Sequence, residues 1–257
     1  IVVPRHDAVA PEHAGFPGLR LLLVGGGIML VALASLTSIL MAAALLAAAM
    51  AALVGVVMLD RASRTRLMPS DAFSTGTVVG SGLWVVLLMP VAGATSAVYL
   101  VLLLLQLWHY GPTLAGGIAA ILAVSWSAAA IASARATRQR LMIIGPIMLT
   151  LGLAGVLCGL LSGQISVVVL AQIAIGAGFG LGNSSLYVTL MDAAGPLERD
   201  RVAALVPTTQ SAGNAIGAAL AGLAANLAGY ASAMNSAAIA QAIIPVFALG
   251  TAMAALA

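Results

Sequence analysis

The chain of 257 residues is 62% hydrophobic and only 7% charged, with a net charge of +3. A soluble domain carries about 25% charged residues, so this composition excludes a soluble globular protein. The small net charge gives no reason to expect nucleic-acid binding, and the single cysteine, Cys158, excludes a disulfide framework. Long runs rich in Ala and Leu, without the alternating segments of a membrane β-barrel, predict an all-α polytopic membrane protein with eight transmembrane helices.

Residues 1–17 are polar and rich in proline, which predicts a cytoplasmic tail or linker. Four side chains of this tail have the chemistry of metal ligands, but their spacing matches no metal-binding motif: His6, Asp7, Glu12 and His13. A solvated linker is therefore preferred, and no metal site is predicted. The chain begins with Ile1 rather than Met, which indicates a fragment of a longer polypeptide.

An uncharged run at 21–59 comes next. As one straight helix it would be about 58 Å long, roughly twice the thickness of a membrane core. We therefore predict a linker helical hairpin over 18–59 that turns at 35–38. A cytoplasmic loop at 60–75 follows, with three Arg and two Asp. The candidate N-caps for the next helix are Asp71, Ser74 and Thr75.

Residues 76–257 are predicted to form a bundle of six helices. The first apolar segment, 76–108, is long for a single span, and Pro90 in its middle predicts a kink. Two spans in this segment are the alternative. The other five spans are expected at 113–134, 141–161, 165–191, 203–227 and 236–257.

The positions of the arginines favour eight spans. With eight, all ten arginines fall in or beside the tail and three connections on the same side, at 60–71, 135–140 and 193–201. The opposite connections contain no Arg and no acid. Because cytoplasmic loops are rich in Arg and Lys, we predict that this side and both chain ends are cytoplasmic, in a plasma or bacterial inner membrane.

The segment 171–226 contains glycines at four-residue spacing, which lets helix backbones approach closely in a membrane. Those expected to pack helices are Gly176, Gly180, Gly213 and Gly217. Amides within apolar spans are costly unless they face protein or water. The amides that are candidates for a substrate cavity are Gln106, Gln172, Asn183, Gln210 and Asn214. The alternative for each amide is a structural hydrogen bond between helices.

Asp192 is the acid closest to a membrane segment, at the cytoplasmic end of its predicted helix. A gating ion pair with Arg199 or Arg201 is one interpretation, and a solvated interfacial acid is the other. No span core contains His, Glu or Lys, so the nucleophile, base or metal cluster of a membrane-embedded enzyme is not expected.

The sequence GAGFGLGNSSLYVTLMDAAGPLERDRVAALVPTTQSAGNAIGAALAGLAAN at 176–226 resembles the C-terminal half of major facilitator superfamily transporters. It is most similar to the fourteen-span drug:proton antiporters of the EmrB/QacA type. Weaker similarities at 16–19, 61–73 and 99–116 follow in the same order, so the resemblance covers about 16–230. It implies a linker hairpin, then the second six-helix bundle of a carrier, with an N-terminal six-helix bundle missing as the partner.

The resemblance implies proton-coupled export of hydrophobic or amphipathic small molecules by alternating access, with the proton gradient as driving force and no cofactor. Two diagnostic motifs of the family are absent, an Asp-Arg-x-Gly-Arg loop and a Gly-Pro antiporter motif; their weaker counterparts are RATRQR at 135–140 and GNAIGAALAG at 213–222. The proton-carrying acids are implied to lie in the missing bundle. A non-transporting accessory membrane protein and a facilitator for another small solute are the alternatives.

Overall fold

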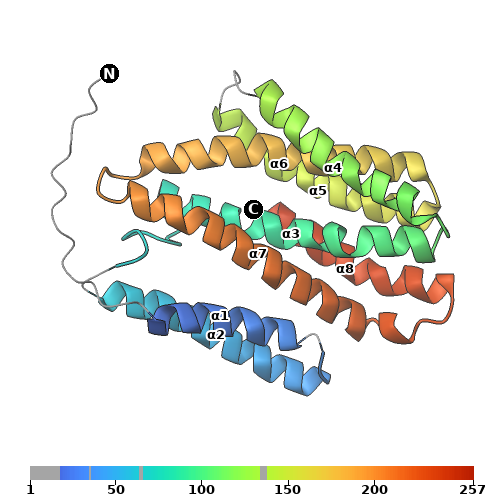
Figure 1. Ribbon diagram of the computed structural model, residues 1–257, viewed down its shortest axis with the longest axis horizontal. Coiled ribbons are helices and arrows are strands. Elements are labelled where there is room, and N and C mark those ends of the chain that lie inside the picture. Colours follow the sequence, from blue (N-terminus) through green and yellow to red (C-terminus); the bar gives the residue numbers. More distant parts are fainter. Residues whose placement is uncertain (1–17, 35, 64–65, 134–137) are drawn as a thin grey trace.

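The computed structural model describes residues 18–34, 36–63, 66–133 and 138–257. Within these ranges the chain forms eight α-helices and one short 3₁₀ helix, which confirms the all-α prediction (Figure 1). The expected tail at 1–17, with its four candidate metal ligands, lies outside the described residues. Arg64 and Arg135 lie outside them as well.

The helices follow the predicted order, and their bounds differ from the predicted ones by a few residues. They are α1 (Gly18–Ala34), α2 (Ile39–Ala62), α3 (Val78–Gln106), α4 (Pro112–Ala132), α5 (Arg138–Ser162), α6 (Ile165–Ala193), α7 (Arg199–Leu227), the 3₁₀ helix η2 (Tyr230–Ser232) and α8 (Ser236–Leu256). Successive helices run in opposite directions, so the connections gather at two ends of an elongated bundle (Figure 1).

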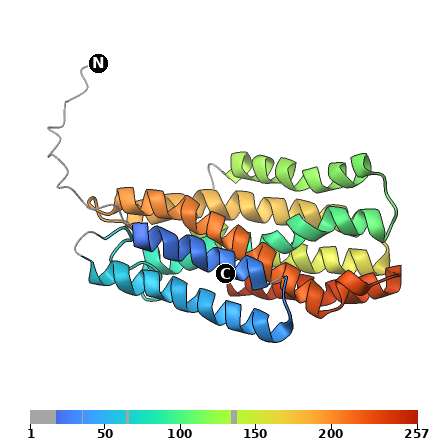
Figure 2. The same cartoon turned by 60° about the horizontal axis from the view of Figure 1, so that its bottom comes forward.

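Six of the described helices are long and apolar enough to span a membrane: α2, α3, α4, α5, α6 and α8. The α1 helix is apolar but has only 17 residues, whereas α7 has 29 residues with a larger share of polar side chains. The chain is therefore a multi-pass membrane protein. Figure 2 shows α1 lying between α2 and α7, with which it makes its main contacts.

The α3 helix lies at the centre of the bundle. It contacts each helix from α4 to α8, and 17 of its 29 residues are buried. Pro90 is buried within α3 without ending it, so 76–108 holds a single helix, as predicted. Proline removes one backbone hydrogen bond from a helix, and in a membrane such a site is tolerated where neighbouring helices enclose it.

The N-cap of α3 is Thr77, so the three capping residues predicted from the sequence are wrong. The Thr77 side-chain oxygen accepts a 3.1 Å hydrogen bond from the Gly80 N–H. The preceding loop folds back over the helix: Phe73 has a φ of 59°, and its carbonyl oxygen accepts a 3.0 Å hydrogen bond from Trp84 Nε1. This fold places Thr77, rather than an earlier residue, at the start of the first turn.

Asp60 lies in the last turn of α2 and is only 2% exposed, which corrects its predicted placement in the loop at 60–75. Its carboxylate lies 2.6 Å from a guanidinium nitrogen of Arg20, and it accepts hydrogen bonds of 2.8 and 2.9 Å from the backbone N–H groups of Leu67 and Met68. Arg20 also donates to Ser63 Oγ. The two charges are 40 positions apart, but a hairpin brings the first turn of α1 next to the last turn of α2.

Candidate functional site

A cavity of about 460 Å³, open on one side, lies between α4, α6 and α7. Its lining combines two aromatic rings, three small or amide polar side chains and three apolar residues: Trp126, Asn183, Ser184, Tyr187, Ala203, Val206, Pro207 and Gln210. Small-molecule sites in proteins have volumes of about 300–1,000 Å³ and largely apolar walls with a few polar groups. The cavity therefore has the size and the mixed chemistry of a site for an amphipathic molecule.

Glycines of α6 allow α4 to form one wall of this cavity. A Cβ atom at Gly176 would lie 2.2 Å from the Leu122 carbonyl oxygen, and one at Gly180 would lie 2.4 Å from the Trp126 carbonyl oxygen. Because both positions lack a side chain, the backbones of α4 and α6 lie directly against each other. This crossing stacks Trp126 on Phe179, with ring centroids 4.9 Å apart and an interplanar angle of 14°.

Glycines of α7 likewise allow its backbone to approach the backbone of α3 closely. A Cβ atom at Gly213 would lie 2.6 Å from the Leu87 carbonyl oxygen, and one at Gly217 would lie 2.4 Å from the Val91 carbonyl oxygen. The α7 backbone therefore packs on α3. Gln210, just before Gly213, lines the cavity that α7 shares with α4 and α6.

The structure brings two of the five candidate amides together. Asn183 of α6 and Gln210 of α7 both line the cavity, and both are partly buried. Within the part of the chain that the structure describes, neither side chain has a hydrogen-bond partner. Asn214, one turn beyond Gln210, is exposed and is not among the residues of the cavity wall.

Gln172 and Gln106 lie away from the cavity. Gln172 is buried where α3, α4 and α6 meet, and its Oε1 accepts a 3.5 Å hydrogen bond from Ser96 Oγ. Gln106 ends α3 at the other side of the bundle, where its Oε1 accepts a 2.5 Å hydrogen bond from the Tyr230 hydroxyl. The Tyr230 ring packs edge to face on Tyr99 with centroids 5.5 Å apart. These two amides therefore join helices.

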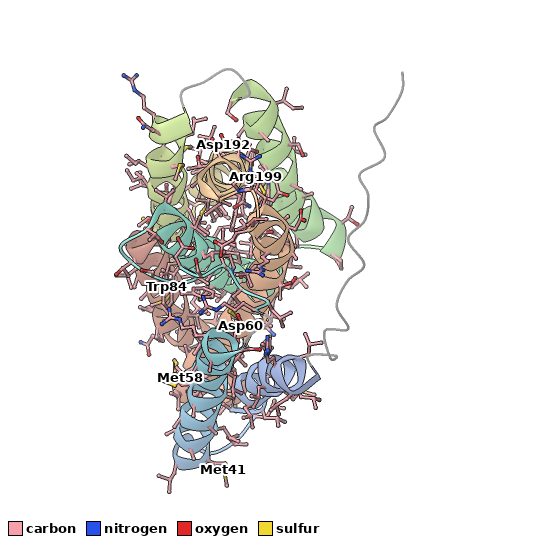
Figure 3. All side chains as sticks on the ribbon, turned by 90° about the vertical axis from the view of Figure 1, so that its left-hand side faces the viewer. Met41, Met58, Asp60, Trp84, Asp192 and Arg199 are labelled. Atoms are coloured by element: carbon pink, nitrogen blue, oxygen red, sulfur yellow. The ribbon has the colours of Figure 1, made fainter. Side chains whose placement is uncertain are left out.

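The candidate gating residues lie at the charged end of the helices, onto which Figure 3 looks. Asp192 is exposed in the last turn of α6, and Arg199 is the first residue of α7. Arg201 lies 3.8 Å from the Glu198 carboxylate. That carboxylate also accepts hydrogen bonds of 3.1 and 3.4 Å from the backbone N–H and the hydroxyl of Ser70. The α6–α7 turn is therefore joined to the loop that precedes α3.

The two ends of the bundle differ in charge. Every Arg, Asp and Glu among the described residues lies in or beside the start of α1 and the α2–α3, α4–α5 and α6–α7 connections. In the ranges that the structure covers, the connections at the opposite end contain none of these residue types. The side chains there are uncharged or aromatic, as in the edge-to-face pair of Trp108 and Tyr110.

This chain is similar to two proteins described as probable multidrug-efflux transporters, from the CDC 1551 / Oshkosh and H37Rv strains of Mycobacterium tuberculosis. It is 30% identical to each over 224 residues, which cover 82% of this chain and 47% of each relative. The chain thus spans about half the length of the curated relatives it matches. No family model and no solved structure matches it. The chain is therefore a membrane protein with distant homology to transporters rather than to enzymes.

The aromatic residues of the cavity were not identified from the sequence. Trp126 lies inside α4, close to the end of the helix, where a tryptophan at a membrane interface would also be found. Tyr187 has a similar position in α6. Sequence position therefore did not distinguish a cavity wall from an interfacial ring, and the stacking of Trp126 on Phe179 depends on how closely α4 and α6 cross.

Proposed function

We propose that this chain is the C-terminal portion of a secondary active transporter that exports hydrophobic or amphipathic small molecules. The proposal is carried by the cavity between α4, α6 and α7, where Asn183 and Gln210 lie among apolar and aromatic side chains. Amides within an apolar bundle provide the few directional contacts that a site for amphipathic molecules needs. The similarity to proteins described as probable multidrug-efflux transporters supports this class of substrate.

In this proposal, residues 76–257 form one bundle of the carrier, 18–59 form a linker hairpin, and a second six-helix bundle completes the transport path. Polar side chains on the outer surface of α7 support a protein or aqueous neighbour, because such groups avoid lipid; they are Thr208, Ser211 and Asn214. The greater length of the relatives agrees with a second bundle. Rocking of one bundle against the other then exposes the cavity to each side of the membrane in turn.

The proposed driving force is proton antiport, with the proton-carrying acids in the partner bundle. Asp192, with Arg199 or Arg201, forms a gate at the charged end in this scheme. The concentration of Arg at this end supports a cytoplasmic location for it, in the plasma or inner membrane. No cofactor is required.

The test is transport by the intact protein in proteoliposomes with an imposed pH gradient. Export of amphipathic dyes is expected to follow the gradient. Asn183→Ala and Gln210→Ala are each expected to lower the rate about tenfold, the effect of losing a hydrogen bond in a partly buried site. Gln164→Ala, an exposed amide in the α5–α6 turn, is the matched control and is expected to transport normally. Movement that ignores the gradient would identify a facilitator, and no movement of any dye would support an accessory protein.

The orientation is tested by single cysteines introduced into a Cys158→Ser background. Met234, which is 96% exposed in the α7–α8 connection, and Ser38 in the α1–α2 turn lie at the uncharged end. Arg66 lies at the charged end. Met234→Cys and Ser38→Cys are expected to react with an impermeant maleimide in whole cells, whereas Arg66→Cys reacts after permeabilisation. Labelling of Arg66→Cys in intact cells would reverse the orientation.

A further inference from the structure

We propose that Trp126 is the residue on which the ligand stacks, and that the cavity takes a planar, aromatic, uncharged molecule with hydrogen-bonding groups along one edge. The inference rests on the proposed transport function and adds to it the class of substrate and the residue that selects it.

Trp126 is held in place before any ligand arrives. One face of its indole ring packs on Phe179, which is itself only 7% exposed. The Phe179 ring occupies space where α3 lacks a side chain, since a Cβ atom at Gly93 would lie 2.6 Å from Phe179 Cζ. The Trp126 backbone is fixed against Gly180. A ring that is already ordered loses little conformational freedom when a ligand binds.

Trp126 lines the cavity, and although Phe179 stacks on its ring, the residue remains 37% exposed. Two aromatic rings in offset-stacked or edge-to-face contact gain free energy beyond the burial of their surface, a gain that a saturated group does not have. Tyr187 supplies a second ring in the same wall. A flat aromatic molecule therefore matches this surface better than a branched or saturated one.

Asn183 and Gln210 define which hydrogen-bonding groups the ligand needs along one edge. Each amide offers N–H donors and a carbonyl acceptor, and neither has a partner among the described residues. They come from different helices and meet in one cavity. A ligand with a donor and an acceptor on one edge satisfies such an amide, whereas a pure hydrocarbon leaves it unpaired at a cost in free energy.

The lining also argues against a permanent charge. None of the eight residues in the cavity wall is Asp, Glu, Arg or Lys. A cation that binds there gives up part of its hydration and meets no counter-ion in the wall, so the attraction to an aromatic face is its one compensation among the lining residues. The cavity therefore favours a neutral ligand over a cation of the same shape.

The test uses three probes of similar size and equilibrium dialysis with the intact, detergent-solubilised protein. The first is 2-quinolinone, which is planar and neutral and carries N–H and C=O on one edge. N-methylquinolinium is planar but cationic, and decahydro-2-quinolinone is a neutral lactam without an aromatic ring. We expect 2-quinolinone to bind about tenfold more tightly than either of the others, in line with the strength of one aromatic stacking contact.

Substitutions assign this preference to Trp126. Trp126→Leu is expected to weaken 2-quinolinone binding about tenfold while leaving the saturated lactam nearly unaffected, and Trp126→Phe to weaken it about threefold. Trp108→Leu, in the α3–α4 connection at the uncharged end, is the matched control and is expected to leave 2-quinolinone binding unchanged. Equal binding of aromatic and saturated lactams, tighter binding of the cation, or wild-type affinity in Trp126→Leu would overturn the inference.

A second measurement does not depend on the folding of the Trp126 variants. Ser184 is exposed in the cavity wall, so Ser184→Cys in a Cys158→Ser background reports on occupancy through its rate of alkylation. Protection by 2-quinolinone, but not by the other two probes, is the expected result, and no protection contradicts the inference. If 2-quinolinone binds as expected but does not move under a proton gradient, the transport function fails while the site stands. If it moves at the same rate with and without Trp126, only the role of Trp126 fails.

Discussion

The α3–α8 bundle and the α1–α2 hairpin are held in the molecule by different kinds of contact. Lipid tails are as apolar as leucine, so helices in a membrane associate through close backbone packing or polar contacts rather than through the hydrophobic effect. The bundle uses close packing: a Cβ atom at Gly178 of α6 would lie 2.7 Å from the Gly145 carbonyl oxygen of α5. The hairpin lies at one side of the bundle in Figures 1 and 2, and its charged end has a polar attachment: the Asp60 carboxylate binds the backbone N–H groups of Leu67 and Met68 in the loop to α3.

The difference extends to burial. Only 17% of the α2 span is buried, against 61% of the α3 span. The apolar contact between hairpin and bundle is a small cluster formed by Val31, Ala49 and Ala219. Figure 3 shows Met41 and Met58 on the hairpin, where both side chains are exposed, and Asp60 where the hairpin meets the bundle. The bundle is therefore one packed body, whereas the hairpin depends on few contacts.

The largest effect is expected for Asp60→Leu, which leaves the Arg20 guanidinium, 15% exposed, without its carboxylate. Breaking a buried ion pair in this way costs about 3–5 kcal/mol. The same carboxylate also accepts the hydrogen bonds from Leu67 and Met68 in the loop to α3, so its loss frees both hairpin helices at this end. We therefore expect α1 to separate from α7. The measurement is cross-linking of Val31→Cys to Ala219→Cys with a short bis-maleimide in a Cys158→Ser background.

Arg66→Gln is the control for this prediction, since it removes a charge from the same loop at an exposed position. Cross-linking is expected to remain efficient in the control and to fall in Asp60→Leu. If Asp60→Leu cross-links as well as the wild type, the polar contacts of Asp60 do not hold the hairpin, and the contrast between the two regions is wrong.

A smaller effect is expected for Gly178→Ala in the bundle, where the added methyl group would press on the backbone of α5. Overpacking of this kind costs about 1–3 kcal/mol. Gly26→Ala is the matched control, because nothing lies within 4 Å of a Cβ atom at that position of α1, and alanine favours helix over glycine. Thermal unfolding in detergent is expected to show a lower midpoint for Gly178→Ala alone. Equal midpoints for both variants would argue against glycine packing as the force that holds the bundle.

The smallest effect is expected for Tyr230→Phe, which removes the hydrogen bond to Gln106 at the uncharged end. One such bond contributes about 0.5–1.5 kcal/mol. Burial, and then the neighbouring Tyr99, raise the pKa of Tyr230 above its ordinary value of 10.0, so its hydroxyl remains a donor at neutral pH. The contribution of this hydrogen bond to the free energy of unfolding is fully present below pH 10, and it is lost as the pH rises through the raised pKa of Tyr230. The stability difference between wild type and variant should thus be constant from about pH 6 to 9; a change within that range would rule out this hydrogen bond as its source.

Most of the helices were predicted from the sequence because long uncharged runs separated by arginine-rich connections define where a chain crosses a membrane. The shared cavity of Asn183 and Gln210 was not predicted. Their helices are adjacent in sequence, but the face that each presents to α4 depends on backbone contacts at Gly180 and Gly213, which a linear pattern does not reveal. Asp60 was misplaced for a related reason. An acid at the end of an apolar run gives the same sequence pattern whether its carboxylate is solvated or paired with an arginine far away in the sequence.

The hydrogen bonds from Ser70 to Glu198 have a mechanical consequence. One side of the 66–77 loop is fixed to the hairpin through Asp60, and Ser70 is fixed to the start of α7. The hairpin and the start of α7 are therefore joined through the same loop at the charged end of the bundle. A relative movement of the hairpin and α7 that keeps these bonds is a rotation about the charged end, with its greatest amplitude at the α1–α2 turn at the uncharged end.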